Sequence, residues 1–355
     1  MGCSFAQRAA KSPWRTSQLQ QQELTRALAQ YRVPDTKRSV FELTITVIPF
    51  FALWGAAWFA LSLSIWVTVL LAILNAAFLV RIFIIMHDCG HGSFFRSRNV
   101  CNWTGRVLGV LALTPYDVWR QSHAIHHAST GNLDRRGMGD IPTLTIEEYL
   151  KRNWFGRAAY RLIRNPFILF CIVPVYTFVF QNRLPFGFMR SGWLYWASAM
   201  GTNAAIAVVL ALIFWTGGLD VLVFVFLPTM IVAASIGIWL FYIQHQFEHT
   251  TWEREEVWNL QNAAFYGSSH YALPGILRWF SANIGVHHVH HLASRIPFYR
   301  LNEVLRDHSE LENCQRITLY ESLHCARLHL WDEECQRLLT FSQALSNANP
   351  NKSLV

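Results

Sequence analysis

Long apolar stretches occur in two pairs along the chain. Residues 43–86 contain one charged side chain, Arg81, and this length accommodates two membrane spans of about 20 residues with a turn near 62–64. A second pair lies within residues 193–242. The two stretches of this pair are separated at 216–220, a short segment that contains two glycines and Asp220. The pattern predicts an all-α integral membrane protein with four transmembrane helices in two hairpins. The expected spans are about 43–62, 65–86, 193–215 and 221–242.

A further apolar stretch, Phe167–Phe180, is short, contains Pro174 and has Arg164 and Arg183 on either side. Apolar stretches of about 10–14 residues are more often re-entrant, interfacial or buried than spanning. We expect this stretch not to cross, because a crossing would put the histidines before and after it on opposite membrane faces.

Lys and Arg residues fall on one side of the predicted spans. Seven precede the first span, eleven lie in residues 87–164, nine follow Tyr242, and neither tight turn between paired spans contains any. The positive-inside rule therefore places both termini and the long middle segment in the cytoplasm. The soluble parts are then a helical N-terminal segment, 1–40, and a C-terminal segment, 306–355, with a helical pattern expected over 301–345.

Composition supports a membrane protein. Hydrophobic residues make up 52% of the chain and charged residues only 15%, whereas a soluble domain carries roughly 25% charged residues. The net charge is +8, but no Lys/Arg run resembles a nucleic-acid-binding arm. Anionic lipids or an acidic soluble protein are better counterparts for this charge.

Histidines cluster between the predicted spans and never inside one. Twelve of the fifteen lie between His87 and His291. Apart from His270, these twelve form four groups. The groups are His87 and His91; His123, His126 and His127; His245 and His249; and His287, His288, His290 and His291.

Helical spacing lets each group present imidazoles together, because residues three or four positions apart share a helix face. His87 stands where the second span emerges and His245 where the fourth emerges, so both lie at the same membrane depth. We expect each group to direct two or three rings toward one point and the groups to converge.

The number of imidazoles indicates two metal ions. Imidazole suits Fe, Zn, Cu and Ni, and eight or nine nitrogens exceed what one tetrahedral zinc needs. Iron is the redox-active choice beside an apolar membrane pocket. Soluble di-iron proteins of the ferritin type use glutamates together with two Glu-x-x-His motifs instead, whereas this sequence has that motif once, at 321–324.

Four residues near the histidine groups are expected to contact the metal ligands rather than the metal itself: Asp88, Glu248, His249 and His288. His288 lies about 100° around a helix from its neighbours, and His249 is four residues after His245. Asp88 and Glu248 could accept hydrogen bonds from imidazole N–H groups. His249 could instead be a ligand through this spacing, and a surface role is the alternative for His288, Asp88 and Glu248. A lone HxxxH pair would often be a coincidence.

The three boxes HxxxH, HxxHH and HxxHH, in this order and at these intervals, resemble those of the membrane fatty acid desaturases, most closely the acyl-lipid branch. The resemblance runs from about residue 40 to 305 and so defines a domain over 41–305. It includes four sequence segments: HDCGHGSFF from His87, QHQFE from Gln244, NIGVHHVHHL from Asn283 and RIPFYRL from Arg295.

The resemblance implies a cytoplasmic helical cap that holds two irons above four spanning helices. It implies no catalytic residues beyond the metal ligands, and the extra ligand from the last span corresponds to His245. Related sequences often have an acidic residue where this chain has His249. The implied ligands are His87, His91, His123, His126, His127, His245, His287, His290 and His291.

The implied activity is introduction of a cis double bond into an acyl chain with O2 and external electrons. The chain lacks the His-Pro-Gly-Gly motif of a fused b-type cytochrome domain, so we expect a separate donor, a ferredoxin or b-type cytochrome. We expect the chain itself to be a multi-pass integral membrane protein, in the inner membrane if the source is bacterial.

A hydroxylase, ketolase or acetylenase on the same scaffold is the nearest alternative. A non-catalytic metal-binding membrane protein predicts histidines inside the spans, and a purely structural protein leaves the histidines unexplained.

Overall fold

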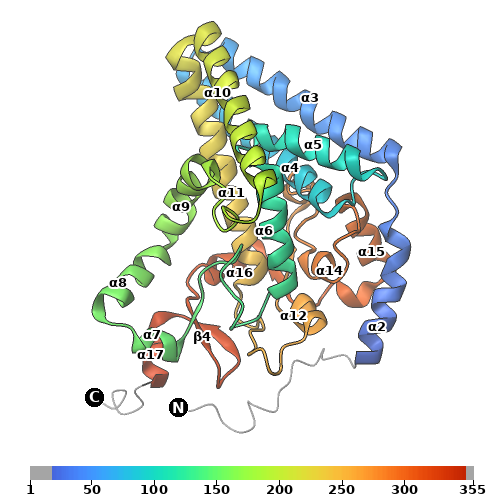
Figure 1. The fold of residues 1–355 in the computed structure, drawn as a ribbon, viewed down its shortest axis with the longest axis vertical. Coiled ribbons are helices and arrows are strands. Elements are labelled where there is room, and N and C mark those ends of the chain that lie inside the picture. Colours follow the sequence, from blue (N-terminus) through green and yellow to red (C-terminus); the bar gives the residue numbers. More distant parts are fainter. Residues whose placement is uncertain (1–17, 349–355) are drawn as a thin grey trace.

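A computed structural model describes residues 18–348, which form a predominantly helical molecule (Figure 1). Three helical stretches are long and apolar enough to cross a membrane: α3 (Thr36–Ala60), α4 (Ile65–His91) and the stretch Trp193–His245. A bent pair of helices within 154–183 would be another if it formed one span. The prediction of a mainly helical protein with several apolar, membrane-compatible helices is therefore confirmed.

The bounds of α3 and α4 follow from local signals. Asp35 caps α3, since its carboxylate accepts hydrogen bonds from the backbone N–H groups of Lys37 (2.8 Å) and Arg38 (3.2 Å). Gly92 ends α4 in the left-handed conformation, with φ of 68°. Because α4 continues beyond the predicted span to this glycine, the first histidine pair lies on its last turns.

The stretch Trp193–His245 consists of α10 (Trp193–Val221), a π-helical segment η5 (Leu222–Phe226) and α11 (Leu227–His245). Gly218 breaks the helix with φ of 72° and ψ of −170°. In Figure 1 the chain climbs along α10 and descends along α11. A straight helix of 53 residues would measure about 80 Å, far more than a bilayer core of about 30 Å. The break lies inside the predicted turn at 216–220.

The segment before α10 is helical but bent. Its first helix, α8 (Trp154–Ile163), is followed by a second run whose axis is turned by 59°. That run comprises η2 (Ile168–Ile172), α9 (Val173–Val175), η3 (Tyr176–Phe180) and η4 (Gln181–Arg183). The expectation that Phe167–Phe180 does not cross the membrane stays a prediction.

Short elements form the lower part of the view in Figure 1, beneath α5 (Arg98–Leu111) and α6 (Tyr116–Ser129). The short helices among them are α7 (Ile146–Lys151), α12 (Leu260–Tyr266), α13 (Gly275–Phe280), α14 (His287–Leu292), η6 (Phe298–Arg300), α15 (Leu301–Asp307), η7 (Ser309–Leu311), α16 (Leu319–Cys325) and α17 (Phe341–Ala348). One hydrophobic core is continuous from Phe50 in α3 to Trp331 in this lower part.

Five short strands correct the all-α prediction. β1 (Leu144–Thr145) is parallel to β4 (Leu330–Asp332), and β4 is antiparallel to β5 (Arg337–Leu339). β2 (His270–Ala272) is parallel to β3 (Arg316–Thr318). Three of the strands lie in 301–345, where only helix was expected, because strands of three residues are too short to show an alternating pattern.

The N-terminal segment is helical as far as it is described, through α2 (Gln18–Ala27) and η1 (Leu28–Arg32). It packs on the C-terminal part of the chain, where the Tyr31 hydroxyl donates to the Asp307 carboxylate at 2.9 Å. The remaining parts of the predicted end segments, 1–17 and 349–355, lie outside the described residues.

Candidate metal centre

Nine histidines from four helices meet in two groups. In each group, one ring nitrogen of every member lies within 4.8 Å of those of all the others. Group A consists of His87, His91, His123, His127 and His290. Group B consists of His126, His245, His287 and His291. These are the nine residues that the sequence predicted as ligands, and the structure brings all of them together.

Two of the helices divide their histidines between the groups. In α6, His123 and His127 are four residues apart and face group A, while His126 faces group B. In α14, His287 and His291 face group B and His290 faces group A. Each of these two boxes thus directs two rings at one group, within the expected two or three, and its third ring at the other group, because α6 and α14 lie between the two groups.

The closest contacts within the groups all join Nε2 atoms. In group A, Nε2 of His123 is 3.0 Å from that of His91 and 3.1 Å from that of His127, and the Nε2 atoms of His127 and His290 are 3.2 Å apart. In group B, Nε2 of His245 is 3.1 Å from that of His126 and 3.0 Å from that of His287. The Nε2 atoms of His287 and His291 are also 3.0 Å apart.

Hydrogen bonds cannot explain these contacts. An imidazole nitrogen has either one N–H or one lone pair, yet Nε2 of His123, His127, His245 and His287 each has two such neighbours. Two nitrogens about 2.1 Å from one ion and at right angles would be about 3.0 Å apart, against about 3.4 Å in a tetrahedron. The observed spacing is close to the smaller value, and each group could hold a metal ion.

Burial favours the neutral form, which a metal requires, in five of the rings. Burial, reinforced by the other histidines, holds the pKa of His123 and His127 well below 6.5. The same causes lower the pKa of His287, His290 and His291. At neutral pH their lone pairs are therefore free for coordination.

Three outer ring nitrogens have partners that fix which nitrogen faces the centre. Nδ1 of His126 donates to the Asp140 carboxylate at 2.7 Å, and Nδ1 of His245 donates to the Gly267 carbonyl at 3.0 Å. Nδ1 of His87 donates to Asp88 at 3.1 Å. With the proton on Nδ1, the Nε2 lone pair points into the group. Asp88 was anticipated from the sequence, whereas Asp140 and Gly267 were missed.

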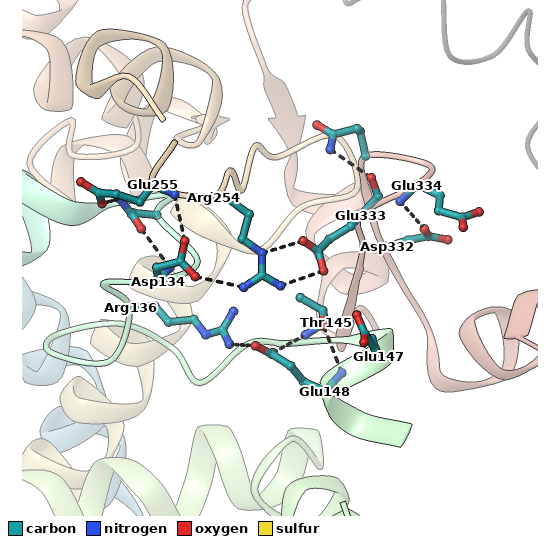
Figure 2. Close-up of polar contacts among 12 residues, drawn as sticks. Asp134, Arg136, Thr145, Glu147, Glu148, Arg254, Glu255, Asp332, Glu333 and Glu334 are labelled. Carbon is teal, nitrogen blue, oxygen red and sulfur yellow. Dashed lines mark hydrogen bonds and ion pairs between the residues drawn. The ribbon is translucent and has the colours of Figure 1, made fainter. Parts of the chain in front are cut away.

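Asp140 lies in the loop between α6 and β1, and ion pairs tie this loop to distant segments (Figure 2). Arg254 bonds Asp134 at 3.0 Å and both carboxylate oxygens of Glu333, at 2.8 and 3.0 Å. Arg136 of the same loop pairs with Glu148 at the start of α7. No short sequence signal links Asp140 to His126, because the loop between them has no regular spacing.

The other anticipated accessory residues lie away from both groups. His249 is exposed, and Glu248 lies 3.6 Å from Arg337 in a partly exposed ion pair. His288 is fully buried, and its Nε2 donates to the Leu311 carbonyl at 3.0 Å. Burial lowers its pKa to about 3. Within the described residues, no hydrogen bond or ion pair joins any of these three to a histidine of group A or B.

Group A is more accessible than group B. An open pocket of about 230 Å³ is lined by His91, His123 and Trp119, with Arg98 and Arg120 at its rim. The Trp119 ring stacks on His123, with centroids 4.7 Å apart. A cavity of about 10 Å³ lies beside His245 of group B, which is room for about one water.

The chain is similar in sequence to a known protein family and to several of its members. The family model described as "Fatty acid desaturase" matches residues 64–320, which contain all nine histidines. A Bacillus subtilis (strain 168) protein named "Fatty acid desaturase" is 42% identical over 322 residues, which are 90% of this chain and 91% of the relative. The "sn-1 acyl-lipid omega-3 desaturase (ferredoxin)" of Synechocystis is 30% identical over 62% of this chain and 61% of its own length. The "sn-1 oleoyl-lipid 12-desaturase" of Picosynechococcus is 28% identical, with 72% of each chain covered.

Proposed function

Since the chain belongs to the fatty acid desaturase family, we propose that it is a membrane acyl-lipid desaturase. In this proposal it uses O2 and external electrons to introduce a cis double bond into an acyl chain at a histidine-ligated di-iron site. The observation that carries the proposal is the meeting of nine imidazoles in groups of five and four, with Nε2 atoms spaced as ligands of two ions. Names of the relatives support acyl-lipid substrates.

The histidines of group A would hold one iron and those of group B the other. When bound, the irons would supply the oxidising power to remove two hydrogens from adjacent unactivated methylenes. The chain's own contribution is positional. Asp88, Asp140 and the Gly267 carbonyl keep the protons on Nδ1, and the buried setting of group B excludes bulk water.

An aromatic surface beside group A is suited to an acyl chain. Trp119 stacks on His123 and lies edge-on to Phe83, with ring centroids 5.5 Å apart. Phe83 in turn contacts Phe178 of the bent segment, at 6.2 Å. These rings lead from group A toward the apolar helices, so a methylene chain from the bilayer would meet apolar surface up to the metals.

We propose four crossings in two hairpins, with both termini and the metal centre on the cytoplasmic face. α4 and α11 would then end on the same side, where their histidines meet. α5 and α8 support an interface at this level, because each has exposed apolar residues, such as Trp103 and Trp154, together with arginines. The units would be a cytoplasmic segment 1–40, a membrane domain 41–305 and a cytoplasmic segment 306–355.

Electrons would come from a separate protein. The name of the Synechocystis relative includes ferredoxin, and a net charge of +8 favours an acidic partner. A ferredoxin or a b-type cytochrome meets this requirement.

The test is expression in a host that lacks the activity, with mass-spectrometric determination of double bonds in its lipids. We expect O2-dependent cis unsaturation and about two irons per chain in the purified protein, and loss of both the product and one iron in His126→Ala and His290→Ala. His249→Ala is the matched control, since this exposed histidine lies outside both groups. Hydroxylated or keto products, or a wild-type protein without iron, would contradict the proposal.

A further inference from the structure

Arg81 is a buried charge that the proposed function does not use. It lies in α4, and its side chain pairs with Glu42 of α3 and donates from Nε to the Thr46 hydroxyl at 3.0 Å. Arg81 is 1% exposed and Glu42 2%. Charges inside a membrane bundle are costly unless paired and are usually retained for function.

The guanidinium of Arg81 contacts more than its ion-pair partner. It donates to the backbone carbonyl of Trp279, and it lies 4.1 Å from the centroid of the Trp279 ring and 5.1 Å from that of Phe298. An ion pair that merely joined α3 to α4 would need none of these contacts. Arg81 therefore also holds the segment that contains Phe298.

Phe298 leads from Arg81 to the metal centre. Its backbone N–H donates to Oδ2 of Asp88 at 2.7 Å, and Oδ1 of Asp88 accepts from Nδ1 of His87 at 3.1 Å. Phe298, Asp88 and His87 are all at most 4% exposed. Phe298 also belongs to the motif Arg295–Leu301, which the sequence analysis singled out without a role.

We propose that Arg81, balanced by Glu42, is a positioning residue for group A. Its planar guanidinium fixes Phe298, the Phe298 N–H fixes the Asp88 carboxylate, and Asp88 sets the orientation of the His87 ring. Lysine cannot replace it, because an ammonium lacks the flat face and the fork of donors. The inference rests on the proposed function, in that group A binds a metal ion.

The test compares Arg81→Lys with wild-type full-length protein in detergent, both loaded with Fe(II). Lysine keeps the charge opposite Glu42, so we expect a similar melting temperature. We expect one of the two irons to be removed by a chelator roughly tenfold faster than in wild type, since outer partners of a ligand tune metal affinity by about this factor. The second iron should leave at the wild-type rate, because the contacts of Arg81 lead only to group A.

A paired variant and a control separate positioning from general stability. Glu42→Gln combined with Arg81→Met removes both charges and should also release one iron faster. Leu79→Ala opens a cavity in the same helix, at a side chain 4% exposed, and should lower the melting temperature without changing either release rate.

Two results would overturn the proposal while leaving the proposed function intact. One is release of both irons at the wild-type rate from Arg81→Lys and from the paired variant. The other is equal acceleration in Leu79→Ala. A wild-type protein that holds fewer than two irons would instead refute the proposed function, and this inference with it.

Discussion

At the residue scale, each metal group contains one histidine whose outer nitrogen is bonded to a buried carboxylate. Asp88 accepts the hydrogen bond of His87 in group A, and Asp140 accepts that of His126 in group B. Both carboxylates are buried, so each bond is made in a setting where an unpaired partner would be costly. This similarity implies that the orientation of one imidazole per ion is set by a carboxylate.

Replacing Asp140 should therefore weaken metal binding at group B. An amide in Asp140→Asn is a poorer acceptor, so we expect the affinity for the second iron to fall by about tenfold or more. The measurement is titration of metal-free protein with Fe(II). Asp134→Asn is the matched control, since Asp134 is in the same loop but bonds Arg254 rather than a histidine. Equal losses in both variants would show that the loop, not the carboxylate, controls binding.

At the element scale, the position of α6 depends on close packing with α5. A Cβ at Gly105 of α5 would lie 2.2 Å from the ring of Tyr116, at the start of α6. The Tyr116 hydroxyl donates to the Cys89 carbonyl at 2.9 Å, near the end of α4. A glycine thus lets one buried tyrosine join three helices, two of which carry histidines.

Gly105→Ala should consequently destabilise the protein. The Tyr116 ring would have to move, at a cost of about 1–3 kcal/mol, and the melting temperature should fall. Gly201→Ala is the control, because Gly201 lies in α10 with open space around its would-be Cβ. Alanine there should be neutral or stabilising by up to about 1 kcal/mol. A Gly105→Ala protein as stable as wild type would show that the α5–α6 contact is loose.

At the scale of the whole molecule, the centre requires α4 and α11 to end on one side of the membrane. His87, His91 and His245 lie on the last turns of these helices, and the break at Gly218 lies at the opposite end of α10 and α11. Figure 1 shows this separation, with the reversal at the top and the histidine-bearing ends below. The proposed topology therefore puts the Gly218 turn and the metal centre on opposite faces.

Epitope tags can test this arrangement. A tag inserted after Gly218 should be cleaved by protease added outside intact cells, whereas a tag after Glu256, an exposed residue following α11, should be protected. Lysed cells, in which both tags become accessible, provide the control. Cleavage of both tags in intact cells, or of neither, would refute the two-hairpin topology.

The predictable features were those encoded over short distances. The lengths of the apolar stretches predicted α3 and α4. Two glycines predicted the position of the break that is found at Gly218. Helical spacing indicated which histidines share a helix face, and the resemblance to the desaturases implied the nine that meet. By contrast, the pairing of β1 with β4 and of β2 with β3, the Asp140 carboxylate and the Gly267 carbonyl depend on contacts between separate segments, for which local periodicity has no signal.

The sequence by itself determined which residues could face one another within a helix and which stretches need an apolar environment, because both follow from a rise and rotation per residue that hardly vary. Only the tertiary structure decided how the nine histidines divide into one group of five and one group of four. That division depends on how α6 and α14 are rotated between α4 and α11, and rotation is set by packing against residues distant in the sequence, such as that of Tyr116 and Trp119 of α6 against Cys89 and Phe83 of α4. For the same reason, the links from Arg81 through Phe298 to His87 became visible only in three dimensions.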